Sequence, residues 1–102
     1  MICCDFDDFL RALADETRQQ ILHLLQNGEM SVSDLCDHFD QQQPTISHHL
    51  AVLRQANLVT TRQEGKWVYY QANQACVAEC CQEITRRFIP LTLPDRQSEV
   101  NS

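Results

Sequence analysis

The fold of this chain is indicated most clearly by residues 41–55, which read Gln41-Gln42-Gln43-Pro44-Thr45-Ile46-Ser47-His48-His49-Leu50-Ala51-Val52-Leu53-Arg54-Gln55. Pro44 suits the first turn of a helix, because its missing N–H would have no partner there and its φ is already fixed. The apolar residues Ile46, Leu50 and Leu53 then recur at helical spacing, which predicts one buried face. The opposite face carries hydrogen-bonding side chains in place of the usual carboxylates and lysines: Gln43, Thr45, Ser47, His48 and Arg54. Such groups bind base edges and phosphates, so the stretch predicts a DNA recognition helix.

The residues before this stretch predict further helices. A first helix runs from Asp5, with Phe6, Phe9, Leu10 and Leu13 on its apolar face. Asp15 can cap a second helix that ends at Asn27-Gly28. Ser31 and Asp34 have the spacing of a capping box and would open a third, short helix. A turn of a few residues then leads into the quoted stretch, which is the helix-turn-helix layout.

A β-hairpin and one more helix are predicted to follow. Residues 57–62 and 67–70 are β-rich and flank the charged segment Gln63-Glu64-Gly65-Lys66. A last helix is expected from about Asn73 to Phe88, with Val77, Ile84 and Phe88 apolar, before Pro90 and Pro94 prevent its continuation. The fold class is therefore mainly α with a small β-hairpin wing, a winged helix-turn-helix.

Length and composition limit the domain organisation. The 102 residues are 43% hydrophobic, which predicts one globular domain over residues 1–90 and a polar, disordered tail over 91–102. No export signal and no membrane-length apolar run are found, so we expect a cytoplasmic protein without a membrane partner. Six cysteines are then free thiols or ligands rather than a disulfide framework.

The net charge of −6 argues against nucleic-acid binding only if it is taken over the whole chain. Residues 1–40 carry −7 and residues 72–102 carry −1, whereas residues 41–71 carry +2. The basic third of the chain therefore coincides with the predicted recognition helix and hairpin.

Four stretches resemble the ArsR/SmtB family of bacterial repressors, and they occur in the family's order: residues 12–22 (ALADETRQQIL), 43–50 (QPTISHHL), 53–59 (LRQANLV) and 64–66 (EGK). The resemblance implies a homodimer joined through the first and last helices. It also implies binding to a palindromic double-stranded DNA operator without any cofactor, and release when an inducer binds.

The family's base-contacting positions correspond to Gln43, Thr45, Ser47 and His48, and its backbone contacts on the wing to Arg62 and Lys66. We also place His49 and Arg54 in the predicted DNA interface. For His49 the alternative is an imidazole packed inside the protein without a metal role. Adjacent helical residues diverge by about 100°, so one metal ion would not bind both His48 and His49.

The chain departs from the family's best-known sensor patterns. Arsenic sensors carry a run like Glu-Leu-Cys-Val-Cys-Asp-Leu-Cys on the third helix, whereas residues 29–36 here read EMSVSDLC. We interpret the remaining Cys36 as a buried packing residue. The family's zinc site is also absent, because no histidine follows His49.

Cysteines near both ends are the remaining candidates for a sensor site: Cys76, Cys80 and Cys81 on the last helix, with Cys3 and Cys4 as possible additional ligands. Three thiolates suit trivalent arsenic, antimony or a similar soft thiophilic ion. Cys76 and Cys80 share a helix face, whereas Cys81 points about 100° away, so the third sulfur could come from a frayed turn or from the N-terminus. The alternative is that Cys76 and Cys80 are interface packing residues.

The sequence thus predicts a repressor released from DNA by trivalent arsenic or a similar inducer. A redox or reactive-sulfur sensor that uses disulfide or polysulfide chemistry on the same fold is the alternative. An enzyme is disfavoured, since the chain has no Cys-x-x-Cys, no Gly-rich phosphate loop and no histidine after His49 to activate a thiol. A winged helix that binds protein rather than DNA is the third possibility.

Overall fold

Helix α4 (Gln43–Gln55) forms from the stretch predicted to be a recognition helix, with Gln42 as its N-cap and Pro44 in its first turn. Its apolar residues Ile46, Leu50 and Leu53 have no exposed surface and belong to the hydrophobic core. The predicted buried face is therefore confirmed, and the hydrogen-bonding side chains are left on the outside of the helix.

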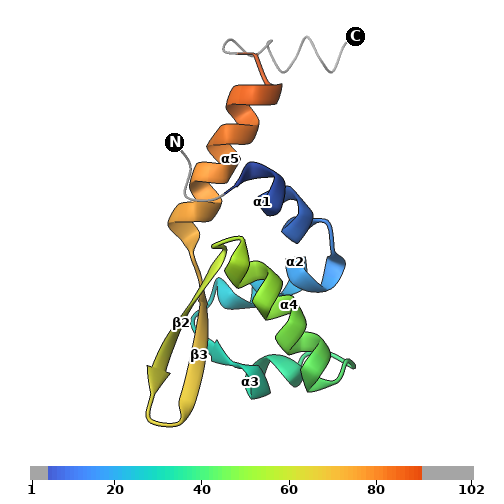
Figure 1. Cartoon of the computed structure of the whole chain (residues 1–102), viewed down its shortest axis with the longest axis vertical. Coiled ribbons are helices and arrows are strands. Elements are labelled where there is room, and N and C mark those ends of the chain that lie inside the picture. Colours follow the sequence, from blue (N-terminus) through green and yellow to red (C-terminus); the bar gives the residue numbers. More distant parts are fainter. Residues whose placement is uncertain (1–4, 91–102) are drawn as a thin grey trace.

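The computed structural model describes residues 5–90, and within that range the predicted element order is confirmed (Figure 1). The chain before α4 forms α1 (Phe6–Leu13), α2 (Glu16–Leu25), β1 (Met30–Ser31) and α3 (Val32–Cys36). The Asp15 cap of α2 and the Ser31–Asp34 capping box of α3 are both present, the latter with its two reciprocal hydrogen bonds. Cys3, Cys4 and the predicted tail over 91–102 lie outside the described residues.

The hairpin consists of β2 (Val59–Glu64) and β3 (Trp67–Ala72), which pair antiparallel from Val59 opposite Ala72 to Glu64 opposite Trp67. Strand β1 pairs with the other edge of β3, which gives the order β1-β3-β2. Strand β2 has the predicted length but lies two residues further along the chain, β3 is two residues longer than predicted, and only Gly65 and Lys66 connect them. Gly65 allows so tight a turn because its φ is +61°, where a side chain would be strained.

Helix α5 (Gln74–Phe88) begins where predicted, because the Asn73 side chain caps it by accepting the backbone N–H of Cys76. The same side chain donates to the carbonyl oxygen of Asn57 at 3.0 Å, which ties α5 to the turn between α4 and β2. In Figure 1, α5 extends away from the hairpin and passes beside α1.

Two predicted apolar faces are wrong in part. On α1, Leu10 is 40% exposed and Ala12 is buried in its place. On α5, the buried positions are Cys76 and Cys80, whereas Phe88 is 67% exposed, because the helix continues past the end of the core. Within residues 5–90, none of the helices is both long and apolar enough to cross a membrane.

Candidate nucleic-acid interface

The outer face of α4 presents the side chains that the sequence assigned to base contacts. Gln43, Thr45 and His48 are exposed, and Ser47 is partly exposed. The helix also has 13 residues, with its basic residue in the last turn, where a cation complements the helix dipole. Because these side chains are exposed, this face of α4 is free to enter the major groove of DNA.

His49 points the other way, into the protein. Its side chain is 13% exposed, and its Nδ1 lies 3.1 Å from Nη1 of Arg18 and 3.8 Å from the Asp15 carboxylate. The packed alternative for His49 is thus what the structure shows, and we remove it from the proposed DNA interface. The reason is that α2 packs against this side of α4.

Arg18 is a residue that sequence reasoning missed. Its Nε donates to the carbonyl oxygen of Ala12 at 2.7 Å and its Nη2 to that of Arg11 at 3.1 Å. Its backbone N–H also donates to Asp15, and this bond is the main reason that the pKa of Asp15 is lowered. Arg18 therefore joins the end of α1, the start of α2 and the recognition helix.

On the wing, the charge of Arg62 is already balanced inside the protein. Its guanidinium binds Glu29 at 2.5 and 3.1 Å and Glu64 at 2.7 Å, and it lies 5.0 Å from the centre of the Tyr69 ring. These hydrogen bonds raise the pKa of Arg62 and lower that of Glu29. As a phosphate contact, Arg62 would have to exchange or share these carboxylates.

Two other basic side chains have no partner within residues 5–90. Among residues 5–90, Arg54 and Lys66 are the basic side chains that form neither an ion pair nor a hydrogen bond with the protein. Arg54 is on α4 and Lys66 is at the hairpin turn. The positive charge that is free to meet phosphates therefore lies on the recognition helix and the wing.

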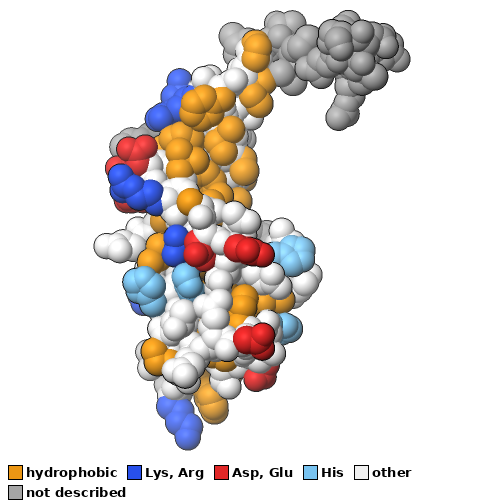
Figure 2. All heavy atoms as spheres, turned by 90° about the vertical axis from the view of Figure 1, so that its right-hand side faces the viewer, with side chains coloured by type: hydrophobic (Ala, Val, Ile, Leu, Met, Phe, Trp, Pro, Cys, Tyr) orange, Lys and Arg blue, Asp and Glu red, His pale blue; other side chains and the backbone are white. Residues whose placement is uncertain are grey.

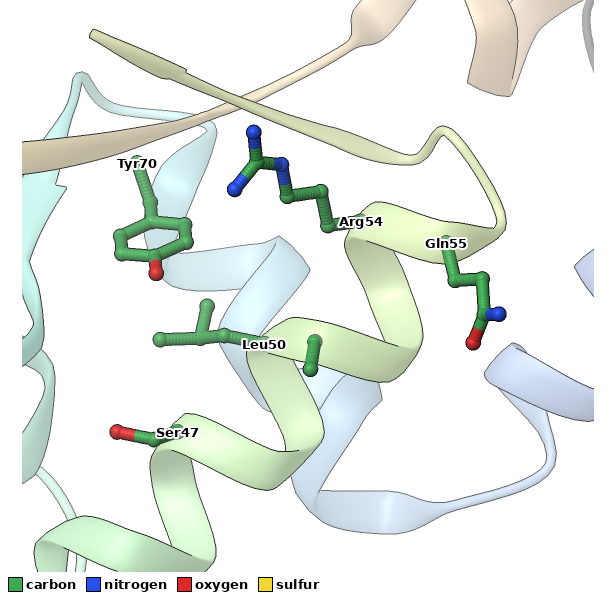
Figure 3. A pocket seen from close by; sticks show the side chains of 6 residues that line it. Ser47, Leu50, Arg54, Gln55 and Tyr70 are labelled. Atoms are coloured by element: carbon green, nitrogen blue, oxygen red, sulfur yellow. The ribbon is translucent and has the colours of Figure 1, made fainter.

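An open groove of about 510 Å³ separates α4 from β3. Ser47, Leu50, Ala51, Arg54 and Gln55 line it from the helix, and Tyr70 lines it from the strand. Figure 3 shows that Ser47, Leu50 and Arg54 project to the side of α4 on which Tyr70 lies, whereas Gln55 points away. Tyr70 is the second residue missed from the sequence, because it was interpreted only as part of a β-rich segment.

Three of the cysteines lie on α5, which follows β3 and extends away from the hairpin turn (Figure 1). Cys76 and Cys80 are buried on one face of α5 and belong to the same core cluster as Phe6 and Phe9, whereas Cys81 is exposed. Cys36, Cys80 and Cys81 are free thiols, whereas Cys76 takes part in a disulfide, so the expectation that every cysteine is a free thiol or a ligand is wrong for Cys76. The divergence between Cys80 and Cys81 is as predicted.

The described residues do not bring three sulfurs together. Over residues 5–90, no three side chains of the types His, Cys, Asp and Glu are grouped to bind a metal ion. Cys36 is partly buried against the core on α3, in keeping with a packing residue. A three-thiolate site would therefore need Cys3 or Cys4, or a rearrangement of α5.

Helices α1 and α5 meet through aromatic and charged side chains. The Phe6 ring is 6.3 Å from the Phe88 ring, and the guanidinium of Arg87 lies over Phe6 at 4.3 Å. Hydrophobic side chains gather on the surface over this end of the molecule in Figure 2. Large apolar residues exposed there are Leu10, Phe88 and Ile89.

Comparison with known proteins places this geometry in a family. Residues 15–61 match the model of the bacterial regulatory protein, arsR family. The chain is 40% identical over 80 residues to an arsenical resistance operon repressor of Staphylococcus aureus. The aligned region covers 78% of this chain and 77% of that protein. It is 53% identical over 62 residues to the arsenical resistance operon repressor of Escherichia coli, covering 60% of this chain and 53% of that repressor.

A solved structure shares the fold over almost the whole chain. It is the crystal structure of a possible transcriptional regulator for arsenical resistance, with a TM-score of 0.73, 31% identity, and coverage of 92% of this chain and 93% of that one. Proteins of this kind regulate transcription by binding DNA and are not enzymes. The chain belongs to the ArsR family of winged-helix, DNA-binding transcriptional repressors.

Proposed function

We propose that this protein is a homodimeric repressor that reads a palindromic operator and is released by trivalent arsenic bound to cysteine sulfur. The observation that carries this proposal is that one small domain holds DNA-binding side chains and buried cysteines on different elements. Free positive charge and hydrogen-bonding side chains lie on α4 and the wing, and the buried sulfurs Cys76 and Cys80 lie on α5 beside α1.

The apolar surface near α1 and α5 supports a dimer. Leu10, Phe88 and Ile89 expose apolar area at the end of the molecule where α1 and α5 lie, and a second copy of the protein would bury this area. A twofold axis at this end would place two α4 helices on the same face of a DNA duplex. Two such helices must be about 34 Å apart to enter successive major grooves.

In this arrangement the outer face of α4 enters the major groove. Gln43 and His48 can donate to and accept from base edges, and Thr45 and Ser47 can hydrogen-bond either bases or phosphates. Lys66 at the wing turn would contact the backbone beside the helix. Arg62, held by Glu29 and Glu64, would support the wing and share its charge with a phosphate only in part.

The arsenic proposal rests on the thiols of α5 and on the similarity to arsenical resistance repressors. Trivalent arsenic exchanges its hydroxides for three thiolates in a pyramidal geometry. Cys76 and Cys80 are four residues apart on one face, and a third sulfur would come from Cys81, Cys3 or Cys4. Because Cys76 and Cys80 belong to the same buried core as Phe6 and Phe9, binding there would move α5 relative to α1.

A thiol–disulfide sensor is the second candidate function. The observation that favours it is that Cys76 is disulfide-bonded while Cys80 and Cys81 remain thiols. An oxidant would take two electrons and two protons from a thiol pair, and a dithiol reductant would return them. The same α1 and α5 contacts would carry the change to the recognition helices.

Mass spectrometry of the reduced protein, with arsenite or with an organic polysulfide, separates the two inducers. Bound arsenic raises the protein mass by the arsenic less the displaced protons, whereas a new disulfide lowers it by two hydrogens. We expect the arsenic adduct, together with loss of affinity for a palindromic duplex selected from a random pool. An arsenite-treated protein with unchanged mass and unchanged DNA affinity would refute the arsenic proposal.

A further inference from the structure

Two polar groups that face the groove between α4 and β3 have no partner among residues 5–90. The Arg54 guanidinium forms no ion pair or hydrogen bond there, and neither does the Tyr70 hydroxyl. No buried polar side-chain atom of the described residues lacks a partner, so the Tyr70 hydroxyl is open to solvent. The hydroxyl is therefore free to form a hydrogen bond with a group that enters the groove.

The helix supplies the remaining wall of the groove. Ser47 and Arg54 are seven residues apart, which is about two turns, so both project from the same side of α4. Leu50 and Ala51 lie between them and make the floor apolar. The side chains in Figure 3 therefore surround a space with a hydroxyl at each of two corners and a guanidinium at a third.

We propose that this groove binds one backbone phosphate of the operator through Arg54 and Tyr70, with Ser47 as a third donor. This inference rests on the proposed reading of DNA by α4. A guanidinium binds a phosphate with two parallel hydrogen bonds, and the tyrosine hydroxyl adds a third. No carboxylate lines the groove, although the chain as a whole carries a net charge of −6.

The position of this phosphate gives it a specific role. Arg54 belongs to the base-reading helix and Tyr70 to the wing strand, so one phosphate would join the two elements. Phosphate contacts fix the register of a protein on a duplex without reading sequence. Tyr70 thus becomes a positioning residue that sets how α4 and the wing are held on the same strand.

Replacing single phosphates by uncharged methylphosphonates in a selected palindromic duplex tests the proposal. With the wild-type protein we expect one position in each half-site to be the most sensitive. Tyr70→Phe should weaken binding to the natural duplex about tenfold for each half-site, the usual effect of one hydrogen bond to a charged group. At the sensitive position, however, the methylphosphonate should lower the affinity of Tyr70→Phe and of Arg54→Gln far less than it lowers the affinity of the wild type.

Two matched variants serve as controls. Tyr69→Phe removes the same hydroxyl from the neighbouring residue of β3, whose ring lies against Arg62 instead. Arg86→Gln removes one positive charge from α5, and Glu83 keeps Arg87 as a partner. Both should keep the full wild-type sensitivity to the modified phosphate.

The outcomes separate this inference from the proposed function. If Tyr70→Phe and Arg54→Gln retain the wild-type sensitivity at every phosphate, the proposed phosphate site is wrong while operator binding stands. If the wild-type protein enriches no duplex at all from the random pool, the proposed function fails and this inference fails with it. Circular dichroism of each variant confirms that a change in affinity reflects the groove and not unfolding.

Discussion

Nη1 of Arg18 lies 3.1 Å from Nδ1 of His49, so the recognition helix is tied to the start of α2. The same guanidinium holds the carbonyl oxygens of Ala12 and Arg11 at the end of α1. A displacement of α1 can therefore reach α4 through one side chain. In the proposed homodimer, this link is a physical route by which a change between α1 and α5 would alter the spacing of the two recognition helices.

Replacing Arg18 by methionine tests how much this link stabilises the fold. The variant keeps a long apolar stem but leaves the acceptors on Ala12 and Arg11 without their donor. We expect the free energy of unfolding to fall by about 2 kcal/mol, as for the loss of hydrogen bonds to a charged group. Urea denaturation at fixed protein concentration measures it. Lys66→Met, at an exposed turn, is the control and should change stability by less than about 0.5 kcal/mol.

The double variant Ser47→Ala with His48→Ala tests the face of α4 that is proposed to read DNA. Both side chains lie on or near the outer surface, so the core and the oligomeric state should not change. Specific affinity should fall by about 100-fold or more, since each good base contact is worth about 1–3 kcal/mol. Unchanged affinity for the selected duplex would mean that another face of the helix enters the groove.

The wing residues Lys66 and Arg62 should respond differently to charge removal. Lys66 has no acidic partner among residues 5–90, whereas Arg62 is held by Glu29 and Glu64. For each bound subunit, Lys66→Gln should reduce the slope of log affinity against log salt by about 1. The charge-neutral double variant Glu29→Gln with Arg62→Gln should keep the wild-type slope. A slope change as large in the double variant as in Lys66→Gln would show that Arg62 also contacts phosphate.

Glu83 should titrate far below an ordinary glutamate. Hydrogen bonds from Arg86 and Arg87 lower its pKa from 4.5 to about 2. Because the pKa is lowered in the folded state, the stabilisation is present above about pH 4.5 and is lost as the pH falls towards 2. Carbon-detected NMR titration of the carboxyl group measures the pKa directly. Glu83→Gln should abolish this part of the acid dependence of unfolding.

Local sequence signals predicted most of the fold. The Ser31–Asp34 capping box, the Asp15 cap and the proline in the first turn of α4 act within a few residues, so they can be recognised without knowing the tertiary structure. The errors at Leu10 and Phe88 have the opposite cause. Each is apolar at a position compatible with the buried face, and only the packing of neighbouring elements decides which side of the helix is covered.

The candidate site was predictable in part for the same reason. The exposed face of α4 follows from the positions of Ile46, Leu50 and Leu53, so its outward residues could be named in advance. The contacts of His49 with Arg18 and of Arg62 with Glu29 span 31 and 33 residues of sequence, and no periodicity reports them. The groove between α4 and Tyr70 depends likewise on how the hairpin packs against the helix.

In the proposed function, sulfur on α5 controls DNA binding by α4. This control is tested most directly by the operator affinity of the fully reduced protein with and without arsenite, for the wild type and for the triple variant Cys76→Ser, Cys80→Ser and Cys81→Ser. Cys36→Ser is the matched control, because Cys36 is a free thiol on α3. We predict that arsenite lowers the affinity of the wild type and of Cys36→Ser about 5- to 150-fold, the usual range of allosteric coupling, and leaves the triple variant bound. Release of the triple variant by arsenite to the same extent as the wild type would contradict control of DNA binding by the α5 cysteines.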